Sequence, residues 1–383
     1  MKKKLMLMVL AMVMVLAFAG CGGGGTEAGG GAAGGSLAGA DSTSPDSAAG
    51  SLKKVSFVAP VALDSFDLMA LYAADYLGYF EEEGIDVEFI EQLGTDDVKM
   101  VAAGTAQFSY PSPGVFMSSI DAGVDNVTAV ANYCAIQIFG IATNKDSGIQ
   151  SFEDLKGKQI ALGSEAWTPL FTPILFKAGV QPEDVEMVSF GAGRYEACAS
   201  GQTPALGTWL NEYYQLLGQG YDFEYLDGEQ VAPQLSNALC TSNDIIESDP
   251  ELVRSFIRAF VKGQYFLHLN PEACADITLY TRPDLKIDWA GAVGAAKGTD
   301  MMELGTTEAE QQARIEAGIG LFDMAYAQNA ADNLLAAGAI SGEIDASKYY
   351  TNDFVDTGWD KAAVEADAAG YEFVSDVYSE AHS

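Results

Sequence analysis

The stretch KVSFVAPVALDSFDLMALYAADYLGYFEEEGIDVEFI, residues 54–90, decides the fold class. Residues 54–60 alternate apolar and polar side chains, which predicts a strand. Residues 65–84 carry Leu and Tyr side chains at helical spacing and stop at Gly84, a residue that favours the left-handed end of a helix. Residues 85–90 alternate again, with the period of two of a strand. A strand, a helix and a second strand in this order indicate a parallel α/β unit.

The same alternation continues along the chain. We expect helices over 95–104, 112–123, 166–179 and 194–201, and strands over 106–110, 158–163, 183–191, 222–226 and 235–242. The apolar stretch 126–144 is long enough for two strands. Residues 248–270 form the clearest helix, with Ser248 or Asp249 as its cap and Pro250 in the first turn. Helix dominates from there to Ser383, so the fold class is α/β with mostly parallel sheets flanked by helices.

The N-terminus has the three parts of an export signal. Lys2 to Lys4 precede an uncharged run from Leu5 to Phe18, and small residues follow. That run is shorter than the roughly 20 residues that a membrane-spanning helix needs. Residues 1–20 are therefore interpreted as a signal peptide, and a short transmembrane anchor is the alternative.

A cysteine follows this signal directly. LAFAGC, residues 16–21, resembles the lipoprotein box of bacteria, in which Cys21 becomes the lipidated first residue of the mature chain. Residues 21–51 are mostly Gly, Ala, Ser and Asp, and such a segment buries too little apolar surface to fold. We therefore expect lipid on Cys21 to attach the protein to the extracytoplasmic face of the cell membrane, through a disordered tether.

About 330 residues follow this tether, which favours two lobes over one core. Without residues 1–20 the chain keeps 17 basic and 54 acidic residues, a formal charge of −37. This acidity argues against a nucleic-acid partner and against tight contact with an anionic membrane surface. It does not determine the charge of a ligand pocket.

Sulfur and histidine chemistry is sparse. Four cysteines remain in the globular part, at 134, 198, 240 and 274, and none belongs to a Cys-x-x-Cys pair. They could form disulfides or serve as small buried apolar residues. The chain has two histidines and no P-loop, nucleophile elbow or His-Glu-x-x-His motif, so we expect no metal, no cofactor and no enzyme activity.

Five segments together resemble one family. They are LGYFEEEGIDVEF (77–89), MVAAGTAQFSY (100–110), KDSGIQSFEDLKGKQIAL (145–162), KAGVQPEDVEMV (177–188) and SDPELVRSFIRAFVKG (248–263). In this order they resemble the solute-binding proteins of ABC importers for nitrate, sulfonates, taurine and thiamine precursors. One departure is Gly-Gln-Thr-Pro-Ala at 201–205, where the family usually has Gly-x-Val-Asp-Ala. The departure leaves the ligand class open.

The resemblance implies a periplasmic-binding-protein-like fold of type II. Two lobes would be joined by two hinge crossings, at 138–144 and 235–242, and would close on a ligand in the cleft between them. Lobe 1 would hold 52–141 and much of 242–383, together with a C-terminal helical region, and lobe 2 would hold 142–241. The resemblance also implies a monomer that delivers a small molecule to the permease subunits of an ABC importer.

Candidate binding residues follow from the fold class itself, because open α/β sheets bind ligands beyond the carboxyl ends of their strands. Reading the residues that follow each expected strand gives Asp64, Asp67, Tyr110, Ser112, Tyr133, Gln137, Trp167, Arg194, Tyr195, Glu196, Trp209 and Asn211. Each of these has an ordinary structural alternative, as core packing or as a solvated surface group.

The residue types favour some ligands over others. Trp167 and Trp209 could stack on a flat ring, and Asp64 or Asp67 could accept from an ammonium or a ring N–H. Gly191 to Arg194 could hold an anion at a helix start. With many aromatic and acidic candidates and one basic one, we expect a planar nitrogen heterocycle such as a thiamine pyrimidine precursor. The alternatives are a sulfonate, taurine or nitrate anion, an exported enzyme with Asp64 and Glu196 as acid and base, and an adhesin.

Overall fold

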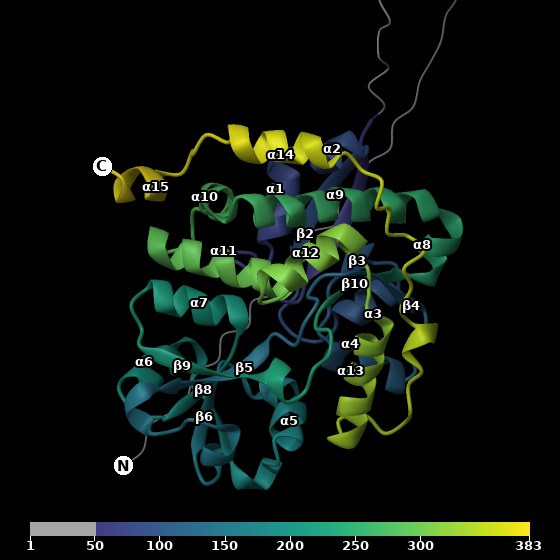
Figure 1. The fold of residues 1–383 in the computed structure, drawn as a ribbon. Coiled ribbons are helices and arrows are strands. Elements are labelled where there is room, and N and C mark those ends of the chain that lie inside the picture. The colour runs from purple at the N-terminus through teal and green to yellow at the C-terminus, as the bar shows by residue number, and fades with distance from the viewer. Residues whose placement is uncertain (1–50) are drawn as a thin grey trace, which may run out of the picture. The chain divides into compact units, whose positions relative to one another are not determined.

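The computed structural model describes residues 51–383, which form one unit with two β-sheets and many helices (Figure 1). The signal peptide, Cys21 and all but the last residue of the tether lie outside the described residues. No helix in the described part is long and apolar enough to cross a membrane. All four cysteines of this part, at 134, 198, 240 and 274, are buried and free.

The first sheet has the strand order β2-β1-β3-β10-β4. β1 pairs in parallel with β2 and β3, whereas β10 is antiparallel to β3 and β4. The strands are β1 (Lys53–Ala59), β2 (Ile85–Glu91), β3 (Phe108–Ser109), β4 (Val127–Asn132) and β10 (Ala238–Ser242). The predicted strand–helix–strand unit at 54–90 is thus confirmed.

The second sheet has the order β7-β6-β8-β5-β9. β6 pairs in parallel with β7 and β8, whereas β5 is antiparallel to β8 and β9. The strands are β5 (Phe139–Asn144), β6 (Gln159–Leu162), β7 (Glu186–Ser189), β8 (Ala205–Trp209) and β9 (Phe223–Asp227). The prediction of mostly parallel sheets is wrong, because half of the pairings in each sheet are antiparallel.

The antiparallel pairings arise where the chain changes sheets. It leaves the first sheet after β4, passes through 133–138, and enters the second sheet as β5. It returns through 228–237 and enters the first sheet as β10. The predicted crossings at 138–144 and 235–242 therefore consist largely of β5 and β10, the strands with which the chain enters each sheet. The connecting segments themselves, 133–138 and 228–237, come just before these strands. The two passages confirm the predicted architecture of two halves with two crossings.

The helix predicted over 65–84 is two helices. α1 (Met69–Tyr76) ends before Gly78, which has a φ of 81°, and α2 (Tyr79–Glu82) begins after it. A left-handed residue at this point turns the chain out of the first helix, and glycine adopts it without strain. The prediction missed this break because the apolar spacing continues through it.

α9 (Pro250–Leu269) covers the first sheet, as Figure 1 shows. Asp249 caps it by accepting from the backbone N–H of Leu252 at 3.1 Å. The Phe256 ring stacks on Phe108 of β3, with ring centroids 4.1 Å apart, and on Phe57 of β1. The capped, apolar sequence of 248–270 therefore forms the helix that it predicts.

The remaining helices flank the sheets, and those after α9 confirm the helical C-terminal region. They are α3 (Asp97–Ala102), α4 (Pro113–Asp121), α5 (Thr168–Lys177), α6 (Arg194–Ala199), α7 (Leu210–Gly218), α8 (Asn243–Ser248), α10 (Pro271–Thr281), α11 (Trp289–Leu304), α12 (Glu308–Ala317), α13 (Met324–Ala336), α14 (Lys361–Gly370) and α15 (Asp376–Ala381).

The sequence analysis missed β8, although it is the central strand of the second sheet. Its sequence, ALGTW, lacks the run of large β-branched residues that marks a strand. A methyl group at Gly207 would come within 2.7 Å of the side chains of Leu162 and Phe171. The strand therefore needs a small residue where its neighbours pack on it.

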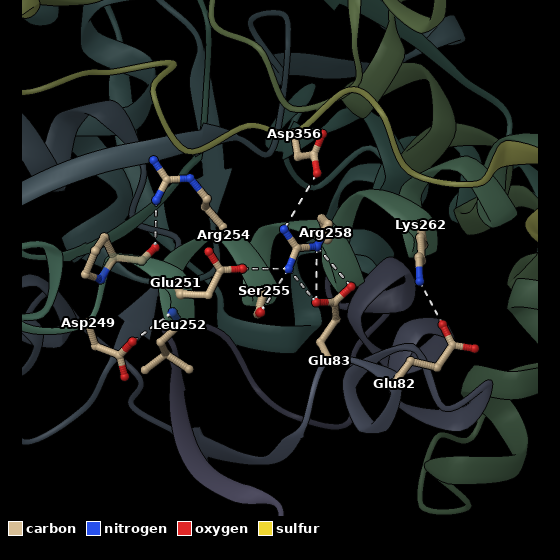
Figure 2. A network of polar contacts seen from close by, with 11 residues as sticks. Glu82, Glu83, Asp249, Glu251, Leu252, Arg254, Ser255, Arg258, Lys262 and Asp356 are labelled. Atoms are coloured by element: carbon tan, nitrogen blue, oxygen red, sulfur yellow. Dashed lines mark hydrogen bonds and ion pairs between the residues drawn. The ribbon is translucent and has the colours of Figure 1, made fainter.

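A polar network joins α9 to α2 and to the segment before α14 (Figure 2). Arg258 donates to both carboxylate oxygens of Glu83, with its Nη2 2.8 Å from Oε2. It also donates to Glu251 at 3.0 Å, and its Nη1 lies 3.6 Å from Asp356. The Arg258 and Glu83 side chains are only 20% and 14% exposed. The pair is therefore better shielded from water than an ordinary surface ion pair.

We predict that Arg258→Ala lowers the free energy of unfolding by about 1.5–3 kcal/mol, because several charge-assisted hydrogen bonds are lost at once. Lys99→Ala is the control, because Lys99 pairs with Asp96 and the two side chains are 59% and 60% exposed. That change should cost less than about 1 kcal/mol. Urea denaturation measures both, and equal losses would show that the shielding of the Arg258 pair is unimportant.

Candidate ligand-binding cavity

A cavity of about 640 Å³ lies where the strands of the two sheets end. Asp67, Tyr110 and Tyr133 line it from segments that follow β1, β3 and β4 of the first sheet. Trp167 lines it from the segment after β6, and Trp209 ends β8 of the second sheet. Both sheets thus contribute to one site, as the rule for open α/β sheets predicts.

Asp67 is the polar centre of the cavity. One oxygen of its carboxylate, Oδ1, accepts from Trp209 Nε1 at 2.9 Å and from Asn211 Nδ2 at 3.2 Å. Its backbone carbonyl accepts from the Tyr133 hydroxyl at 2.8 Å. These three bonds hold the loop after β1 against the second sheet and the first crossing.

Burial raises the pKa of the Asp67 carboxyl above its usual value. The hydrogen bonds from Asn211 and Trp209 counteract this rise, and the nearby carboxylate of Glu212 adds to it. Trp209 and Asn211 both donate to Oδ1, and the Ser65 hydroxyl lies near enough to the carboxyl to lower its pKa as well. The side chain can therefore still accept from a ligand.

Aromatic rings form the walls on both sides. The Tyr110 and Tyr133 rings stack with centroids 4.5 Å apart, and the Trp167 and Trp209 rings meet edge to face at 5.4 Å. A Cβ at Gly163 would come within 2.3 Å of the Trp167 ring, so the indole lies directly against the backbone. The cavity therefore presents flat, rigid faces to a ligand.

Arg194 lies behind this wall and is paired internally. Its side chain and that of Glu212 are 7% and 9% exposed and form an ion pair. Glu212 also accepts from the Tyr195 hydroxyl and, at 2.6 Å, from Thr208 Oγ1. The guanidinium packs over the Trp167 ring at 4.9 Å. Its charge is thus balanced by a carboxylate before any ligand arrives.

The structure brings together half of the predicted binding residues. Six line the cavity, namely Asp67, Tyr110, Ser112, Tyr133, Trp167 and Trp209. Three further predicted residues lie in the hydrogen-bonded layer behind Asp67 and Trp167 and do not line the cavity, namely Arg194, Tyr195 and Asn211. Gln137 does not line it either and is buried next to Glu229. Asp64 and Glu196 are exposed and do not line it, and Glu196 accepts from Tyr221 at 3.0 Å.

Several lining residues were not among the predicted ones. Asn237 lies on the second crossing, and its amide donates to the Tyr110 carbonyl at 3.0 Å. Its place in a polar segment just before a strand could have indicated it. Leu93 and Met302 have no such signal, because Leu93 precedes a loop glycine and Met302 lies in a helix far along the chain.

The chain is similar to proteins of several functions. It is 26% identical to the riboflavin-binding protein RibY of Chloroflexus aurantiacus, over 75% of this chain and 82% of that one. It is 26% identical to a formylaminopyrimidine-binding protein of Halalkalibacterium halodurans, over 62% and 73%. A 4-amino-5-hydroxymethyl-2-methylpyrimidine phosphate synthase of Legionella pneumophila is 25% identical, over 56% and 70%.

A solved structure supports the fold. The alkanesulfonate-binding protein SsuA of Xanthomonas axonopodis pv. citri superposes with a TM-score of 0.57 at 15% identity, over 78% of this chain and 98% of that one. At this identity the likeness concerns the fold alone.

The family model described as NMT1/THI5 like matches residues 65–274. This range includes every strand after β1. It also includes all the cavity residues other than Pro60, Val61, Ala62 and Met302. The chain therefore belongs to the NMT1/THI5-like family.

Proposed function

We propose that this protein binds a planar nitrogen heterocycle between its two halves and delivers it unchanged to the permease of an ABC importer. The observation that carries the proposal is the Asp67 carboxylate, which is fixed by two donors and bordered by aromatic walls. A carboxylate in this position accepts from a ring N–H or an amino group, while the rings stack on the heterocycle.

The charge of the cavity favours this ligand over an anion. Among residues 51–383, Asp67 is the only acidic residue that lines the cavity, and no Lys, Arg or His lines it. Arg194, the one basic candidate, already pairs with Glu212. A sulfonate or nitrate would therefore approach a carboxylate without a compensating cation. This argues against the sulfonate, taurine and nitrate alternative.

The relatives agree with this choice. The names of two of them specify riboflavin and formylaminopyrimidine, and both compounds are planar nitrogen heterocycles. The exported-enzyme alternative with Asp64 and Glu196 has less support, because neither carboxylate lines the cavity. The proposal also includes that the protein is a monomer and that lipid on Cys21 anchors it to the membrane. Mass spectrometry of the protein from the membrane fraction tests whether Cys21 carries lipid.

We predict that riboflavin or formylaminopyrimidine raises the unfolding temperature and that taurine does not. At about 100 times its dissociation constant a ligand stabilises the fold by about 2.7 kcal/mol, which thermal denaturation detects readily. Asp67→Asn should weaken binding roughly 10- to 150-fold, because one charge-assisted hydrogen bond contributes about 1.5–3 kcal/mol.

Asp64→Asn is the matched control, because Asp64 is an exposed carboxylate of the same loop outside the cavity. It should leave the affinity unchanged. Stabilisation by taurine with none by either heterocycle would overturn the proposal, and so would equal affinity losses in the two variants.

We also predict that Asp67 reduces the stability of the empty protein. The pKa of its carboxyl is raised in the folded state, so the fold disfavours the ionised form, and the resulting penalty grows as the pH rises through that pKa. Asp67→Asn should therefore gain stability relative to the wild type as the pH rises above about 4, the ordinary pKa of an aspartate, until Asp67 is ionised in the folded state as well. Thermal denaturation across this range measures the difference, and a constant or shrinking difference would contradict the assignment.

A further inference from the structure

Helices α7 and α11 meet backbone to backbone. α7 follows β8 of the second sheet, whereas α11 belongs to the C-terminal region and lies next to α9 and α10; Figure 1 draws α11 directly above α7. A Cβ at Gly294 would lie 2.2 Å from the Tyr214 carbonyl oxygen, and one at Gly298 would lie 2.4 Å from Asn211 Cα. A Cβ at Gly218, the last residue of α7, would lie 2.2 Å from the Ala290 carbonyl oxygen. Only glycine allows this spacing.

Asn211 connects this contact to the cavity. Its Nδ2 donates to Thr299 Oγ1 of α11 at 3.3 Å and to Asp67 Oδ1 at 3.2 Å. A side-chain amide nitrogen carries two hydrogens, and the two acceptors account for both. Thr299 is itself fixed, because its hydroxyl donates to the Ala295 carbonyl at 2.9 Å. The amide that holds the cavity carboxylate is therefore held by α11.

We propose that Gly298 and Thr299 are positioning residues for ligand binding. Gly298 lets α11 approach Asn211 closely, and Thr299 orients the Asn211 amide so that it holds Asp67 in place for the ligand. Neither residue lines the cavity. The inference rests on the proposed role of Asp67, and it assigns to α11 a part in affinity that no sequence motif indicates.

Gly218 provides a control variant that disturbs the same helix contact at a greater distance from Asn211. A Cβ there would collide as closely as one at Gly298, but it lies seven residues from Asn211, roughly 10 Å along the helix axis. We expect Gly298→Ala and Gly218→Ala to lower the unfolding temperature by comparable amounts. Only Gly298→Ala should weaken the binding of riboflavin or formylaminopyrimidine, by tenfold or more in calorimetric titration. Equal affinities in the two variants would overturn the proposal.

Substitutions of Thr299 test the same idea without adding a side chain that would push α7 and α11 apart. Thr299→Val keeps the shape but removes the acceptor for Asn211, and we expect a three- to tenfold loss of affinity. Thr299→Ser keeps the hydroxyl and should restore affinity to within twofold of the wild type. Wild-type affinity in Thr299→Val, or no recovery in Thr299→Ser, would contradict the role of Thr299.

A second readout needs no ligand. Carbon-13 NMR of labelled Asp carboxyls, with the Asp67 signal assigned by its loss in Asp67→Asn, measures the pKa of Asp67. Displacing Asn211 removes a donor to the ionised form, so this pKa should rise in Gly298→Ala and Thr299→Val and stay unchanged in Gly218→Ala and Thr299→Ser. If the wild type binds neither probe, the proposed function fails, yet these titrations still support or refute the positioning. An unchanged pKa in all four variants would overturn it.

Discussion

The hydrogen bonds from Trp209 and Asn211 to one oxygen of Asp67 are the contact on which the rest of the site depends. The acceptor lies in the loop after β1, and both donors lie at the end of β8 and the start of α7. They join parts of the chain more than 140 residues apart, and they do so at the bottom of an aromatic cavity. Under the proposed function, a ligand therefore meets an acceptor that is already oriented by its donors, and binding does not have to order it.

The charge of the whole chain and the charge of its cavity have separate origins. The formal charge of −34 counts every acidic and basic residue of the chain, and it argues against nucleic acid as a partner. The cavity has its own charge balance: Arg194 and Glu212 pair with each other behind the wall, and Asp67 is the acidic residue that lines the cavity. Buried ion pairs add little net stability, so this one is better understood as shaping the wall under Trp167.

The sequence predicts the parts of the fold that follow local rules. The unit at 54–90 and the capped helix after Asp249 form where their patterns place them, and the residues that follow strands supply half of the predicted site. The predictions from the sequence fail where the structure of a segment depends on contacts with residues far away in the chain. β8 was missed because it has a glycine, Gly207, where the side chains of Leu162 and Phe171 pack on the strand. Arg194 was predicted to bind a ligand, but it pairs with Glu212, which is 18 residues away. No local pattern reveals that Met302 joins the cavity.

The way β10 enters the first sheet bears on how the chain can assemble. β10 separates β3 from β4, so β4 has no neighbour in its sheet until residues 238–242 are present. Everything in the second sheet is synthesised between these two strands. A nascent chain must therefore keep β4 unpaired while the ribosome makes more than 100 further residues, and the first sheet cannot be obtained from one continuous fragment that omits the second sheet. Such long-range closure slows folding and favours chaperone contact during synthesis.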